Sequence, residues 1–201
     1  TPGYPDFIGP ALASLGAVET AIVVVSASGG VEVNTRRLFE AAGREGLARA
    51  IVINKMHAEN VNLPALLTTI RESFGNHCIP LNLPTGGGKD VVNVLAENAS
   101  GQTDLGDAES AKMALVEAIV EVDEAMMERY LGGETISPGE ISRALSKAMV
   151  AGKLIPIMFT DARDNVGVKA LMDAIAAYFP SPVSGKQRVG IRGSGETAQE
   201  V

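Results

Sequence analysis

Three short runs of β-branched and other apolar residues constrain the fold of this chain more than any other feature. They span residues 20–26, 50–54 and 154–160. Each run is apolar at successive positions, so both faces of the strand that it forms must be buried, as in a parallel sheet covered by helices. Residues 78–83 are a weaker fourth candidate, and Pro80 favours a position at the sheet edge.

Helical patterns lie between these runs, and their order predicts an α/β fold with a parallel sheet. Asn34 can cap the first helix, and Ser137-Pro138-Gly139-Glu140 has the spacing of a capping box. The strand–helix alternation is broken between residues 85 and 152, which predicts a mostly helical insertion. The predicted helices are 34–45, 63–74, 108–131, 137–151 and 167–178. The predicted organisation is a core of 1–84 and 153–182, an insert of 85–152, and a linker or tail of 183–201.

Composition narrows the class of protein. Hydrophobic residues make up 46% of the 201 residues, which is enough for a core, and the net charge of −7 argues against a general nucleic-acid binder. No apolar run reaches the length of a membrane span. One cysteine and two histidines provide few ligands for a metal site. The single cysteine excludes an intrachain disulfide and indicates a reducing, cytoplasmic setting. We interpret His77-Cys78 as a structural pair, not as a metal site or a thiol nucleophile.

Polar segments follow the predicted strands. Ligands bind at the carboxyl ends of strands in open α/β sheets, so these segments are candidates for a site. They could converge with one another and with the start of the chain. The candidates are Asn54-Lys55-Met56-His57, Thr160-Asp161-Ala162-Arg163 and residues 1–7.

Several segments, in collinear order over residues 1–182, match one family. Thr1-Pro2-Gly3 matches the end of its switch II motif Asp-Thr-Pro-Gly-His, and Asn54-Lys55-Met56 matches the start of its base-recognition motif Asn-Lys-Met-Asp. The chain resembles a translational GTPase, closest to elongation factor G and elongation-factor-G-like proteins. The other matching segments are 79–84 (IPLNLP), 117–134 (EAIVEVDEAMMERYLGGE), 156–168 (PIMFTDARDNVGV) and 178–182 (YFPSP).

This resemblance implies a P-loop GTPase-type core that lacks its N-terminal part, with the G′ subdomain as the insertion. A chain that begins at Thr1 instead of Met is accordingly expected to be a piece of a longer protein. The intact protein would bind GTP or GDP with Mg²⁺, and we expect none of them bound to this fragment. The implied partners are the ribosome and, through the insert helix, the ribosomal stalk protein.

The resemblance also implies roles for single residues. Thr1, Pro2 and Gly3 would lie at the γ-phosphate, where the Gly3 N–H senses it. Asn54 would tie neighbouring loops together, and Lys55 would lay its apolar stem over the base. The Asp161-Ala162 loop would close over the base. Guanine recognition in the family uses a carboxylate that accepts two ring N–H bonds side by side.

The sequence departs from the family pattern at several positions. The phosphate-binding motif GxxxxGK[ST] is absent, since Gly86-Gly87-Gly88-Lys89 has the wrong spacing and is followed by an acid. Tyr4 stands at the position of the catalytic His, and His57 stands at that of the base-reading Asp. Asp161 replaces the Ser of the Gly-Ser-Ala loop. One hypothesis is that the Asp161 carboxylate substitutes for the one missing at position 57.

These departures leave three functional hypotheses open. The first is a GTP-hydrolysing translation factor, the second a ribosome-binding paralogue that has lost hydrolysis, and the third a hydrolase with changed base preference. Tyr4 also fits a packing residue, His57 a solvated loop residue, and Asp161 an ordinary acid before a helix. We expect this fragment alone to be catalytically inactive and able to self-associate through exposed apolar sheet surface.

Overall fold

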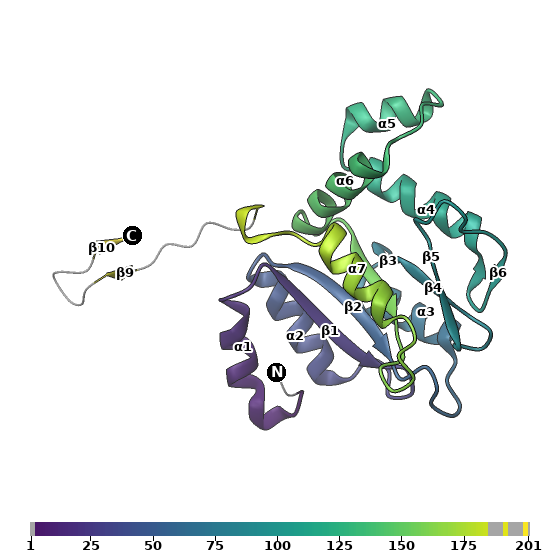
Figure 1. Cartoon of the computed structure of the whole chain (residues 1–201). Coiled ribbons are helices and arrows are strands. Elements are labelled where there is room, and N and C mark those ends of the chain that lie inside the picture. The colour runs from purple at the N-terminus through teal and green to yellow at the C-terminus, as the bar shows by residue number, and fades with distance from the viewer. Residues whose placement is uncertain (1–2, 185–190, 193–198, 201) are drawn as a thin grey trace.

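The computed structural model describes residues 3–184, 191–192 and 199–200. Its centre is a four-stranded parallel sheet in the order β1-β2-β8-β3 (Figure 1), which confirms the predicted α/β fold. Each strand coincides with one of the apolar runs or overlaps it. The strands are β1 (Thr20–Ser26), β2 (Ala48–Asn54), β8 (Ile155–Phe159) and β3 (Cys78–Pro80).

The two central strands carry the core. All five residues of β8 are buried, and β2 pairs with it in the register Ile51↔Ile157, Val52↔Met158 and Ile53↔Phe159. β3 pairs with β8 alone, so Pro80 does lie in a strand at the edge of the sheet. The other edge strand, β1, leaves Ile22 and Val24 exposed, so the expectation that both faces of each strand are buried is wrong for β1, which has a neighbour on one side only.

Helices cover both faces of the sheet (Figure 1). α2 (Val33–Arg44) and α3 (Leu63–Phe74) bury Phe39 and Ile70 against Ile51 and Ile53 of one face. α7 (Val168–Tyr178) and the helices of the insertion cover the opposite face, where Val52 points. No helix in the described part of the chain is long and apolar enough to cross a membrane.

Two helix boundaries differ from the prediction. The expected helix 108–131 is two helices, α4 (Ala108–Val120) and α5 (Glu124–Leu131), because the Asp123 carboxylate accepts the backbone N–H of Met126 and starts a new helix. Asn34 does not cap α2, which begins one residue earlier after Glu32. The Asn34 side-chain amide instead donates to the Gly3 carbonyl, at 2.8 Å.

Short antiparallel strands that were not predicted lie between β3 and α4. The apolar stretch 78–83 divides into β3 and β4, and β4 turns away from the main sheet to pair with β5. The capping box of Ser137 and Glu140 is present at the start of α6. The elements are β4 (Asn82–Thr85), β5 (Asp90–Asn93), β6 (Gln102–Thr103), β7 (Gly106–Asp107) and α6 (Pro138–Val150).

Both ends of the described chain carry short elements. Before β1 lie η1 (Pro5–Phe7) and α1 (Ile8–Leu15), which were not predicted, and α1 packs against α2. After α7 come η2 (Pro182–Ser184) and the paired strands β9 (Ile191–Arg192) and β10 (Gln199–Glu200). The remaining positions of the predicted tail lie outside the described residues.

A buried amide fastens the β4–β5 hairpin, which leads from the core into the segment 85–152, to the sheet. The side chain of Asn82 is fully buried. Its Nδ2 donates to the Phe159 carbonyl at 2.9 Å, and its Oδ1 accepts the Phe159 N–H at 2.7 Å. The side chain thus replaces a neighbouring strand at the end of β8, and both backbone groups are satisfied.

We predict that Asn82→Ala lowers the free energy of unfolding by about 2–4 kcal/mol, because it leaves a buried donor and a buried acceptor of Phe159 without partners. Urea unfolding measures this change. Asn93, the exposed cross-strand neighbour of Asn82, provides the matched control, and Asn93→Ala should cost less than about 1 kcal/mol. Equal losses in the two variants would contradict the assigned role of Asn82.

Candidate functional site

Two loops meet at the carboxyl ends of β2 and β8. Asn54 is the last residue of β2, and Thr160 and Asp161 directly follow β8. Because the two strands are adjacent and parallel, the loops after them lie side by side, although about a hundred residues separate them in sequence. Two of the three predicted segments are therefore brought together.

Asn54 fastens these loops to each other. Its side-chain Oδ1 accepts the backbone N–H of Ala162 at 3.0 Å and lies 3.4 Å from the Thr160 hydroxyl. Its backbone carbonyl accepts the N–H of Ala27, which follows β1. One residue thus joins the ends of three strands.

Lys55 has a backbone conformation that is uncommon for a residue with a side chain. Its φ is +67°, in the left-handed region. The chain turns sharply at this residue, so that Lys55 is exposed while the next residue, Met56, is buried. Such local strain persists where the surrounding contacts determine the conformation, and it is often found at functional sites.

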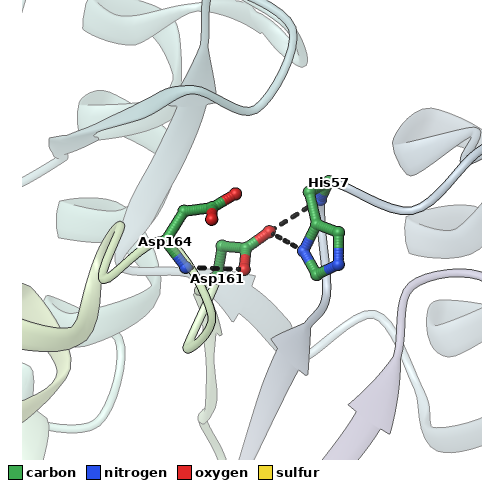
Figure 2. A group of neighbouring side chains, drawn as sticks. All are labelled: His57, Asp161 and Asp164. Atoms are coloured by element: carbon green, nitrogen blue, oxygen red, sulfur yellow. Dashed lines mark hydrogen bonds and ion pairs between the residues drawn. The ribbon is translucent and has the colours of Figure 1, made fainter.

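His57 and Asp161 form a hydrogen-bonded pair (Figure 2). Oδ2 of Asp161 accepts the backbone N–H of His57 at 2.7 Å and lies 2.5 Å from the ring Nδ1 of the same histidine. Oδ1 of Asp161 accepts the backbone N–H groups of Arg163 and Asp164 at 3.1 and 3.4 Å. Asp161 is 1% exposed, and all of these donors point at its carboxylate.

The electrostatics of Asp161 follow from these bonds. Burial by itself would raise the pKa of Asp161, but the hydrogen bonds donated by His57 and Asp164 outweigh it and hold the pKa below its ordinary value. The carboxylate is therefore charged at neutral pH and is already engaged by N–H groups of its own chain. This geometry does not favour the hypothesis that Asp161 itself reads a base.

The same region contains a cluster that could be considered for a metal ion. Ligand atoms of His57, Asp161 and Asp164 lie within 4.8 Å of one another. The two oxygens of Asp161 already accept four N–H groups, counting one from the His57 ring. We interpret the cluster as a hydrogen-bonded network that orients the imidazole.

The start of the described chain is bonded to α2. The Gly3 carbonyl accepts the Asn34 amide, and the Tyr4 side chain is 74% exposed beside the short helix that it precedes. Within the described residues, no hydrogen bond or ion pair joins Gly3 or Tyr4 to His57 or Asp161. Thr1 and Pro2 lie outside the described residues.

The glycine turn and a neighbouring cleft were not predicted as parts of the site. The N–H groups of Gly87 and Gly88 donate to the carboxylate of Asp104, at 3.1 and 2.8 Å, so this turn already holds an anion of its own chain. The turn lines a cleft of about 670 Å³ together with His57 and several of residues 58–64. In the sequence, this turn was indicated by the run of three glycines at 86–88. In the structure all three have positive φ.

His77 and Cys78 lie elsewhere, at the start of β3. Cys78 is buried, and this burial raises the pKa of its thiol to about 11. A thiol with such a pKa is protonated at neutral pH and is a poor nucleophile. The geometry supports the interpretation of this pair as structural.

We predict that Asp161→Asn lowers the free energy of unfolding by about 1.5–3 kcal/mol at pH 7, since hydrogen bonds to a charged group are lost. The folded-state pKa is depressed, so this stabilisation is present above the unfolded-state value of about 3.9 and is lost as pH falls through the folded-state value. The difference between the two proteins should therefore shrink below about pH 4.

Denaturant unfolding at a series of pH values tests this prediction. Asp164→Asn is the matched control, because its carboxylate lies in the same loop but is about half exposed. We expect it to change stability by less than about 0.5 kcal/mol at any pH. A loss in Asp161→Asn that does not depend on pH would contradict the assigned charge.

Comparisons with known proteins identify the family. The model of the family described as the elongation factor Tu GTP binding domain matches residues 1–181. Elongation factor G-like proteins from two strains of Mycobacterium tuberculosis are 36% identical over 195 residues, which covers 91% of this chain. A crystal structure of a protein from Thermus thermophilus has a TM-score of 0.79 and 31% identity, and the match covers 91% of this chain and 30% of that one.

The match spans only 27% of the length of the curated relatives. The match of the family model, over residues 1–181, includes the whole four-stranded sheet and both loops of the site. The parallel sheet with helices on both faces has the P-loop GTPase-type architecture expected from the resemblance. The chain belongs to the family of elongation factor Tu GTP-binding domains.

Proposed function

We propose that these 201 residues are the later part of the GTP-binding domain of an elongation-factor-G-like translation factor. Residues 1–84 and 153–182 would form its core, and residues 85–152 its G′-like insert. Family membership over residues 1–181 and relatives described as elongation factor G-like support this proposal. The longer protein would bind GTP with Mg²⁺ and hydrolyse it on the ribosome.

The observation that carries the proposal is the bond between Asn54 and the loop after β8. Oδ1 of Asn54 holds the Ala162 backbone in place, and the turn at Lys55 leaves the lysine stem exposed on the same edge of the sheet. A planar base can be enclosed between two such loops, with the apolar stem of Lys55 against its face. The residues present therefore fit the base of a nucleotide.

The phosphates and Mg²⁺ require other residues. The sequence contains no GxxxxGK[ST] motif, and the N–H groups of its glycine turn are directed at Asp104. Phosphoryl transfer relies on a phosphate cradle and metal ligands for charge stabilisation. We therefore propose that this stretch does not hydrolyse GTP by itself and that the longer protein supplies those groups.

A second candidate function is a ribosome-binding paralogue that has lost hydrolysis. The observation in its favour is Tyr4, which stands where the resemblance places a histidine. This residue is exposed, and a phenol differs from an imidazole in reach and geometry. In this case GTP binding and ribosome binding would persist without turnover.

The insertion and the open sheet edge offer surfaces for partners. Four acids on α4, α5 and the turn between them are exposed, and we propose the ribosomal stalk protein as their partner. These acids are Glu117, Glu121, Glu124 and Glu128. The exposed Ile22 and Val24 of β1 would allow self-association of this stretch when it is isolated.

We predict that Asn54→Ala in the full-length protein weakens GDP binding at least tenfold, because the two loops lose the amide that joins them. Calorimetric titration with GDP and Mg²⁺ measures this change. Asn93→Ala, on the exposed strand of the insertion hairpin, is the control and should bind GDP as the unaltered protein does. Unchanged affinity in Asn54→Ala would count against a base site at these loops.

Phosphate release in the presence of ribosomes separates the two candidate functions. Release at about 1 s⁻¹ or faster, within the ordinary range of enzymes, would support the hydrolysing factor. GDP and GTP binding without ribosome-stimulated release would support the paralogue that has lost hydrolysis. Absence of any nucleotide binding would overturn both.

A further inference from the structure

The pair His57–Asp161 has a consequence for which base the site selects. The two residues lie on different loops and are the two departures from the family pattern on the base side of the site. In the structure they contact each other directly, with the ring Nδ1 of His57 2.5 Å from Oδ2 of Asp161. We therefore treat the two departures as one coupled change.

The contact with Asp161 determines which ring nitrogen of His57 is free. A neutral imidazole carries its proton on one nitrogen and a lone pair on the other. In the neutral ring, a carboxylate partner at Nδ1 favours the tautomer with the proton on Nδ1 and leaves Nε2 as an acceptor. Figure 2 shows Nε2 on the side of the ring that faces away from Asp161 and Asp164. The side chain as a whole is 29% exposed.

The hydrogen-bonding capacity of this pair differs from that of a free carboxylate. Guanine presents two donors side by side, the ring N1–H and the 2-amino group. A carboxylate can accept both at once, whereas Nε2 has one lone pair. The Asp161 carboxylate does not supply the second acceptor, because its oxygens are directed at His57, Arg163 and Asp164.

We propose that Asp161 positions the imidazole of His57 and that Nε2 alone contacts the base edge, so that the site binds hypoxanthine nucleotides about as well as guanine nucleotides. Hypoxanthine keeps the ring N1–H and the 6-oxo group of guanine and lacks the 2-amino group. A site with one acceptor gains nothing from that amine. This inference rests on the proposed nucleotide site and adds its base selectivity.

The test compares affinities of the full-length protein for GDP and IDP by calorimetric titration with Mg²⁺. The expected ratio of the two dissociation constants is within about threefold. The double variant His57→Asp with Asp161→Ser restores the family pair and should favour GDP over IDP by at least about tenfold, which corresponds to about 1.4 kcal/mol. His57→Asp alone should bind both nucleotides poorly, because it places a second carboxylate against Asp161.

Single substitutions cover the case in which the double variant does not fold. His57→Ala keeps the buried Asp161 and should weaken GDP and IDP binding by the same factor, whereas the control His77→Ala should weaken neither. A histidine ¹⁵N spectrum of the full-length protein should show His57 protonated at Nδ1 and unprotonated at Nε2. Asp161→Ser should remove this preference, which tests the positioning role separately from stability.

The outcomes distinguish the two proposals. A tenfold or greater preference for GDP in the unaltered protein, or no gain of preference in a folded double variant, would overturn the inference and leave the nucleotide site intact. A loss in His57→Ala that is larger for GDP than for IDP would also overturn it. Failure to bind GDP, IDP or GTP at millimolar concentration would overturn the proposed function itself.

Discussion

The pairing of β2 with β8 is the interaction on which the rest of the molecule depends. Ile51, Val52 and Ile53 lie opposite Ile157, Met158 and Phe159, and the alternating side chains of these strands fill the cores on both faces of the sheet. The insertion lies between the two strands in sequence. The chain therefore leaves the sheet after β3 and re-enters it at β8, and β8 still pairs with β2 in this register. The loops of the candidate site are brought together only because the register is kept.

The sheet and its order of elements were predictable because a strand that is buried on both faces, such as β8, is a continuous apolar run in the sequence. Continuous apolar runs such as 154–160 have no polar alternation, which excludes strands with a solvated face. The capping box at Ser137 was predictable for a similar reason, since it depends only on residues three positions apart. Family membership was carried by short motifs in collinear order, and the comparison with known relatives confirms it.

Interactions between distant residues were not predictable in the same way. The bonds of Asp161 to His57 and of Asn82 to Phe159 join residues 104 and 77 positions apart, and no local pattern announces them. The break at Asp123 was missed because the apolar stripe of the two helices continues across it, while one carboxylate restarts the backbone hydrogen bonding. The candidate residues of the site could be named from the sequence, and the structure added which of their atoms are already engaged.

The buried amide of Asn82 links two segments that are distant in the sequence. This amide is hydrogen-bonded to both backbone groups of Phe159. Phe159 is the last residue of β8, and Asp161 follows it two positions later. The start of the β4–β5 hairpin and the end of β8 therefore hold a fixed position relative to each other, and the Leu81 N–H bond to the Ile157 carbonyl adds to this attachment. The same side chain thus sets where the segment 85–152 leaves the sheet and where the loop that contains Asp161 begins.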